Sequence, residues 1–130
     1  MRYTQKQIDK FNRQKYIIEL EKISKNLFRM FRDKAISAEQ FKAKFMTLKE
    51  KFEEREEILL ESEYHQMLKA YIFALYEKTC LDEAFGEKVF SDIREAQMSQ
   101  LNRLQKLKNG TSYKKEKHKS KPQEEDWGHS

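Results

Sequence analysis

The first apolar pattern along the chain is that of an amphipathic helix ending near Lys34. At the helical period of about 100° per residue, large apolar side chains share one face and basic side chains share the opposite face. The apolar face comprises Tyr16, Leu20, Ile23, Leu27, Met30 and Phe31, and the basic face comprises Lys15, Lys22, Lys25, Arg29 and Arg32. If this helix is extended toward the N-terminus, the positions in line with its apolar face are Arg2, Lys6, Lys10 and Arg13. The first three turns are therefore not expected to pack on this core.

A second helix is expected to begin at Ala38. Ser37 is a suitable N-cap and Gln40, three residues later, is suited to close a capping box. Ile36 and Phe41 have the spacing of a hydrophobic staple. A seam typical of coiled coils follows, at Phe41, Phe45, Leu48, Phe52 and Leu59. Residues 38–80 fit either one long helix or two helices, and a break near residues 61–63 is the favoured alternative.

Residues 67–81 are apolar on nearly every side of a helix. Such a helix must be buried all round, either at the centre of the bundle or beneath a partner subunit. We expect a protein interface centred on Tyr71, Ile72 and Leu75, formed with another protein or with a second copy in a homodimer.

A further helix is expected to start at Asp82 as its N-cap and to run to about Lys108. Its apolar positions are Val89, Phe90, Ile93, Leu101, Leu104 and Leu107. Residues 109–130 carry few large apolar groups and are expected to form a disordered charged tail, so residues 1–108 should form the only domain.

Composition narrows the fold class to all-α. Ala, Glu, Lys, Leu and Arg make up almost half of the chain, Val occurs once, and Gly and Pro are scarce. We therefore expect a bundle of three to four helices with a long central helix or helix pair. The bulky aliphatic and Phe content supports a modest core.

The net charge of +5 is unevenly distributed. Residues 1–34 are basic, whereas residues 50–63 hold seven acidic and two basic side chains. Arg2, Lys6, Lys10 and Arg13 align along one helix edge and are suited to follow a phosphate backbone. A solvated helix edge would show the same pattern. A lysine run in the tail could add sequence-independent affinity for nucleic acid, through Lys114, Lys115, Lys117 and Lys119.

Candidate chemistry is sparse. His65 has Glu61 one turn before it and Lys69 one turn after it, and we expect a half-exposed histidine in a charged helix. Cys80 is the only cysteine and is expected to be a buried, inert thiol. No pattern indicates catalytic residues, a metal site, a cofactor or a small-molecule substrate, so the chain is not expected to be an enzyme.

Two functions remain open. The first is a non-catalytic adaptor or regulator that acts through protein contacts, as an accessory factor of a nucleic-acid-processing complex. The second is direct nucleic-acid binding through the N-terminal stripe and the lysine-rich tail. The lone cysteine and the lack of a long apolar run favour a cytoplasmic protein that does not enter a membrane.

Overall fold

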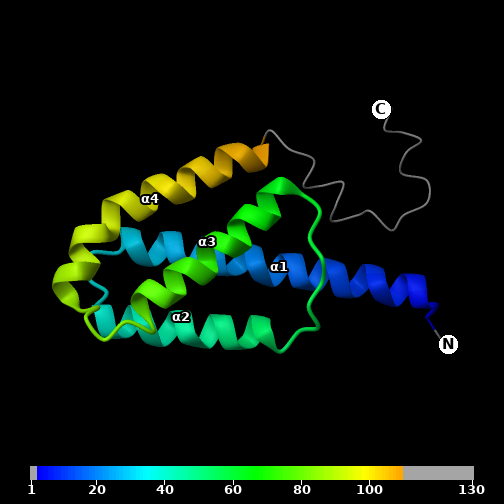
Figure 1. Cartoon of the computed structure of the whole chain (residues 1–130), viewed down its shortest axis with the longest axis horizontal. Coiled ribbons are helices and arrows are strands. Elements are labelled where there is room, and N and C mark those ends of the chain that lie inside the picture. Colours follow the sequence, from blue (N-terminus) through cyan, green and yellow to red (C-terminus); the bar gives the residue numbers. More distant parts are fainter. Residues whose placement is uncertain (1–2, 110–130) are drawn as a thin grey trace.

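The computed structural model describes residues 3–109, and this part of the chain forms four α-helices without a strand. The helices are α1 (Gln5–Arg32), α2 (Ala38–Glu53), α3 (Glu63–Thr79) and α4 (Glu87–Asn109). In Figure 1, α2 and α4 lie on opposite sides of α1, and α3 crosses α1. The prediction of an all-α bundle of three to four helices is confirmed. Residues 38–80 form a helix pair, but the pair is not at the centre of the bundle, because α1 packs against all the other helices. The predicted disordered tail lies outside the described residues.

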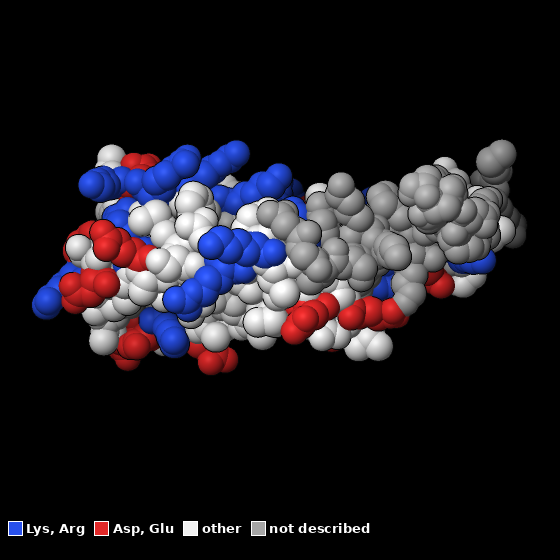
Figure 2. Space-filling model, turned by 90° about the horizontal axis from the view of Figure 1, so that it is seen from above, with Lys and Arg blue, Asp and Glu red and all other residues white. Residues whose placement is uncertain are grey.

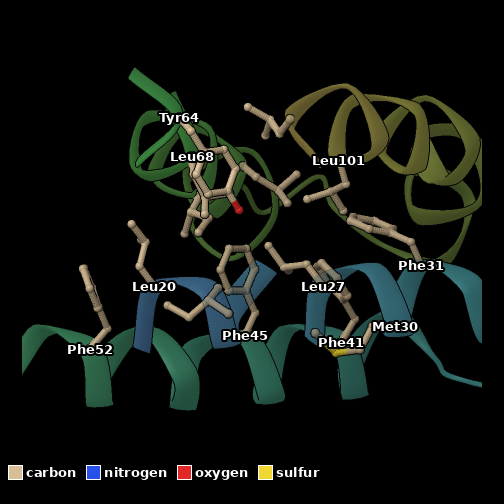
Figure 3. Close-up of a cluster of buried hydrophobic side chains, with 14 of the residues drawn as sticks. Leu20, Leu27, Met30, Phe31, Phe41, Phe45, Phe52, Tyr64, Leu68 and Leu101 are labelled. Carbon is tan, nitrogen blue, oxygen red and sulfur yellow. The ribbon is translucent and has the colours of Figure 1, made fainter. Parts of the chain in front are cut away.

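The core is built around α1, which packs against each of the other three helices. Every apolar residue predicted for the core face of α1 is buried. Figure 3 shows four of these side chains meeting aromatic and aliphatic side chains of the other helices. The four are Leu20, Leu27, Met30 and Phe31, and their neighbours include Phe41, Phe45, Leu68 and Leu101.

The turn between α1 and α2 has the predicted capping box. The Ser37 hydroxyl accepts a hydrogen bond from the Gln40 N–H at 3.0 Å, and the Gln40 side-chain oxygen accepts one from the Ser37 N–H at 2.9 Å. These two bonds satisfy backbone donors at the start of α2, which begins at Ala38 as predicted.

Two charged side chains of α4 bind the backbone of the same turn. The Glu87 carboxylate accepts a hydrogen bond of 2.7 Å from the Ala38 N–H, at the amino end of α2. At the carboxyl end of α1, the Arg94 guanidinium donates to the carbonyl oxygens of Met30, Phe31 and Asp33. A helix leaves such terminal N–H and C=O groups without partners of its own, so α4 completes both helix ends.

The predicted start of the last helix at Asp82 is wrong, because α4 begins at Glu87. The Asp82 carboxylate instead caps a turn, accepting a hydrogen bond of 2.9 Å from the Ala84 N–H. This turn directs Phe85 into the core, where its ring centroid lies 5.9 Å from that of Phe41. Burial of one aromatic ring and the Glu87 contact thus delay the helix by four residues, since an N-cap at Asp82 would make Glu83 the first helical residue.

The predicted break between residues 38 and 80 is confirmed, but it is longer than expected. Residues 54–62 form a non-helical connection between α2 and α3. Its backbone is held by side chains, since Arg13 donates to the Leu59 carbonyl at 3.3 Å and Gln66 donates to the Leu60 carbonyl at 2.7 Å. The placement of Leu59 on the buried seam is wrong, because the helix has already ended and this side chain is 82% exposed.

The start of α1 extends beyond the bundle, as Figure 1 shows at its blue end. We call residues 3–12 the N-terminal arm. Its helix is well capped, because Thr4 and Gln7 form a capping box. The first buried side chain of α1 is Tyr16, so the prediction that the opening turns do not join the core is confirmed.

None of the helices in the described part of the chain is long and apolar enough to cross a membrane.

We predict that Arg94→Met destabilises the fold by about 1–3 kcal/mol, because it leaves partly buried carbonyls at the end of α1 without their donor. Met retains most of the aliphatic volume of Arg. The measurement is urea denaturation followed by circular dichroism. Arg103→Met on the exposed side of α4 is the matched control and should change stability by less than about 0.5 kcal/mol. Equal effects of the two substitutions would contradict this role of Arg94.

Candidate functional site

Two helix segments that lack acidic residues lie side by side on one flank of the bundle. They are residues 22–32 of α1 and residues 96–108 of α4. The segments are antiparallel, because Arg94 reaches the carboxyl end of α1 whereas Gln105 lies near Ser24 and Lys25. Sequence positions about 70 residues apart therefore form one continuous surface.

A groove of about 290 Å³ runs between the two segments, and we call it the basic groove. Its apolar floor is formed by Leu101, which is buried, and by Phe28, which is partly buried. Its polar walls present cations and hydrogen-bonding groups, namely Ser24, Lys25, Arg29, Arg32, Asn102 and Gln105. The Arg32 guanidinium lies 5.7 Å from the centre of the Phe28 ring, which positions the charge at the groove.

The basic groove lies within a larger patch of exposed cations. The patch consists of Lys22, Lys25, Arg29, Arg32, Arg103 and Lys106, all exposed to solvent. Within residues 3–109, none of these six side chains has a carboxylate partner in an ion pair. Figure 2, which views the molecule from above, shows basic side chains gathered along one edge and across this face. With no neutralising partner there, the surface is suited to attract anions.

The groove chemistry fits phosphate recognition. Lys and Arg supply charge, and Arg can donate two parallel hydrogen bonds to one phosphate. Asn102 and Gln105 add uncharged amide donors beside these cations. These side chains can bind an anion, but they include no nucleophile placed beside an orienting base. Within the described residues, no cluster of His, Cys, Asp or Glu has the arrangement of a metal site.

The predicted N-terminal stripe is separate from the basic groove. Lys6 is exposed, Lys10 is half-buried, and Arg13 is bound to the Leu59 carbonyl. Arg13 lies twelve residues before Lys25, or about 18 Å along a helix. Arg2 and the tail lysines Lys114, Lys115, Lys117 and Lys119 lie outside the described residues.

The predicted interface residues belong mainly to the core of the chain itself. Ile72 and Leu75 are 0% and 3% exposed, and Tyr71 is half-buried. The Tyr71 hydroxyl donates a hydrogen bond of 2.7 Å to the Gln97 side chain, and burial raises the pKa of this phenol. Residues 67–81 pack against the other helices of the same chain, but they are not buried all round, because Met67 and Leu81 are 47% and 65% exposed.

The predicted half-exposed environment of His65 is wrong. Its side chain is fully buried, and its Nε2 lies 3.2 Å from a Glu21 carboxylate oxygen on α1. Lys69, one turn later, instead forms an ion pair with Glu57 at 3.0 Å. Sequence spacing shows only which residues neighbour His65 along its own helix, so it could not show that His65 faces α1. This contact joins α3 to α1, and its carboxylate, Glu21, lies one helical turn before Lys25 of the basic groove.

The basic groove is the feature that sequence reasoning missed. Lys22, Lys25, Arg29 and Arg32 were recognisable as a basic helix face, which is also what an ordinary solvated face looks like. The available signal was that residues 22–32 and residues 96–108 both carry cations and no acidic residue. Only their packing shows that the two segments share one surface.

Cys80 is the C-cap residue of α3, and it is partly buried where a fully buried thiol was expected. Burial raises the pKa of its thiol, and the sulfur lies 3.8 Å from the Lys42 carbonyl oxygen. A raised pKa lowers the thiolate fraction at any given pH, and the thiolate is the reactive form.

We predict that Cys80 reacts with a disulfide reagent more slowly at pH 8 than the thiol of a short unstructured peptide does. Denaturant should abolish the difference, because unfolding removes the burial. The assay is direct, since the chain has one cysteine. A native rate equal to the peptide rate would show that the thiol is not shielded.

Comparison with protein-family models, with curated proteins and with solved structures gives no match for this chain.

Proposed function

We propose that this protein binds nucleic acid, without catalysis, through the basic groove and the cations around it. The observation that carries the proposal is the convergence of six exposed cations from α1 and α4 on a surface whose two segments contain no carboxylate.

The dimensions of the surface suit a phosphate backbone. Lys22 and Arg32 are ten residues apart, which is about 15 Å along a helix. Duplex DNA carries one negative charge per about 1.7 Å of its axis, so several phosphates fall within that length. Because buried residues hold α1 in the bundle, its cations start from a fixed helical scaffold, which reduces the ordering cost of binding.

The groove favours contacts with the backbone over contacts with unstacked bases. Its only aromatic side chain, Phe28, is partly buried and has Arg32 beside its ring. Single-strand binding usually needs exposed aromatic platforms on which bases stack. Duplex binding with little sequence preference is therefore the mode that this surface supports.

We predict that the triple substitution of Lys25, Arg29 and Lys106 by Gln weakens binding to a mixed-sequence DNA duplex of about two turns. If each cation contacts one phosphate, the slope of log affinity against log salt should become shallower by roughly 2.7, at about 0.9 per contact. Fluorescence anisotropy over a salt series measures this slope. Helix content should be retained, because Gln is a good helix former.

The matched control replaces Lys44, Lys51 and Lys78 by Gln. All three are exposed on α2 and α3, and the control lowers the net charge by the same amount. The control variant should retain the parental slope of log affinity against log salt. Equal losses in both variants would mean that overall charge, and not the basic groove, determines binding. Binding to polyglutamate as tight as binding to the duplex would favour an acidic protein partner instead.

A helical adaptor that acts through protein contacts is the second candidate function. The observation that favours it is the N-terminal arm, which holds apolar side chains away from the core. The arm lies at the opposite end of α1 from the basic groove, so the two functions use different surfaces.

A further inference from the structure

The N-terminal arm exposes three large apolar side chains. Tyr3, Ile8 and Phe11 are 59%, 39% and 38% exposed. The rings of Tyr3 and Phe11 pack edge to face with centroids 5.2 Å apart, so they form one projecting aromatic pair. Large apolar groups grouped in this way are typical of a contact surface.

A second apolar surface lies on the connection between α2 and α3, and we call it the end groove. It has a volume of about 360 Å³. Its apolar lining comprises Ile58, Leu59, Leu60, Ala70 and Phe73. Leu59 is the most exposed large apolar residue of the described chain, at 82%, although its carbonyl is held by Arg13. The end groove thus presents an aliphatic side chain on a fixed backbone.

The charges around these two surfaces are complementary. The arm carries Lys6 and Lys10 and one carboxylate, Asp9, so its net charge is +1. Neither lysine forms an ion pair with a carboxylate of residues 3–109. Residues 50–63, which supply residues 57–60 to the end groove, have a net charge of −5. Lys69 also lines the groove and is paired with Glu57. Glu54 and Glu56 are exposed on this connection. Association of the two surfaces would bring basic and acidic side chains together around an apolar centre.

The arm of one molecule does not cover its own end groove. Tyr3, Phe11 and Leu59 all remain exposed within the single chain, and α1 continues straight past the connection in Figure 1. Both surfaces nevertheless occur at the same end of the bundle. A twofold axis at that end would allow each arm to meet the end groove of the other molecule, which is the reciprocal contact of a closed dimer.

We infer that the partner of the N-terminal arm is a second copy of this chain, with each arm docked in the end groove of the other copy. Lys6 and Lys10 then face the acidic connection, and the Tyr3–Phe11 pair packs against Leu59. A second copy is favoured over an unrelated partner because the chain itself supplies both complementary surfaces. This contact leaves the basic groove free, so it does not depend on the proposed nucleic-acid binding.

The test is a charge exchange in the full chain, followed by sedimentation equilibrium at low salt. One variant carries Lys6→Glu and Lys10→Glu, and the other carries Glu54→Lys and Glu56→Lys. The parent should be a dimer, and each variant alone should be monomeric because both of its contacts are repulsive. An equimolar mixture should again form dimers, since each mixed pair restores two attractive contacts.

Replacement of apolar residues by Ser provides an independent test. Phe11→Ser and Leu59→Ser should each abolish association without loss of helix content, because both side chains are exposed in the monomer. Ile18→Ser is the matched control, as it removes an exposed apolar residue of α1 outside the arm, and it should leave the dimer intact. The proposal is overturned if the parent is monomeric at all accessible concentrations, or if the two charge variants do not associate when mixed. Capture of an acidic protein by a monomeric parent would also overturn it.

Discussion

The polar backbone at the turn between α1 and α2 is the constraint on which the rest of the structure depends. Each helix end leaves N–H or C=O groups that an apolar environment would penalise. Arg94 satisfies carbonyls at the end of α1, and Glu87 binds the first N–H of α2. These two contacts, together with Phe90 in the aromatic core, hold α4 against α1 and α2. The antiparallel course of α4 then follows, and with it the position of the basic groove.

At the other end of the bundle, the course of residues 54–62 determines which side chains form the end groove. Arg13 and Gln66 satisfy its carbonyl groups, so the chain can leave the helical conformation without unpaired polar groups at those positions. The same course exposes Leu59 and brings an acidic run beside it. Residue Arg13 therefore supports the end groove, although its place in the sequence suggested a phosphate contact.

Cations and carboxylates are concentrated in different regions of the molecule. Cations gather on one flank of α1 and α4, while carboxylates gather near the connection between α2 and α3. The two regions would act in different ways. The basic groove is suited to attract a polyanion from solution, and the acidic end is suited to orient a basic arm. Separate variants can test each surface, since the residues do not overlap.

The sequence by itself determined the helical class, the core face of α1, the capping box at Ser37 and the break before α3, because each depends on periodicity or on neighbours within a few residues. It did not determine where α4 begins, since Phe85 and Glu87 act through contacts with residues far away in the chain. The burial of His65 against α1 was likewise decided by packing. The basic groove also required tertiary structure: periodicity identified each basic face, but only the antiparallel docking of two distant segments placed their cations on one surface.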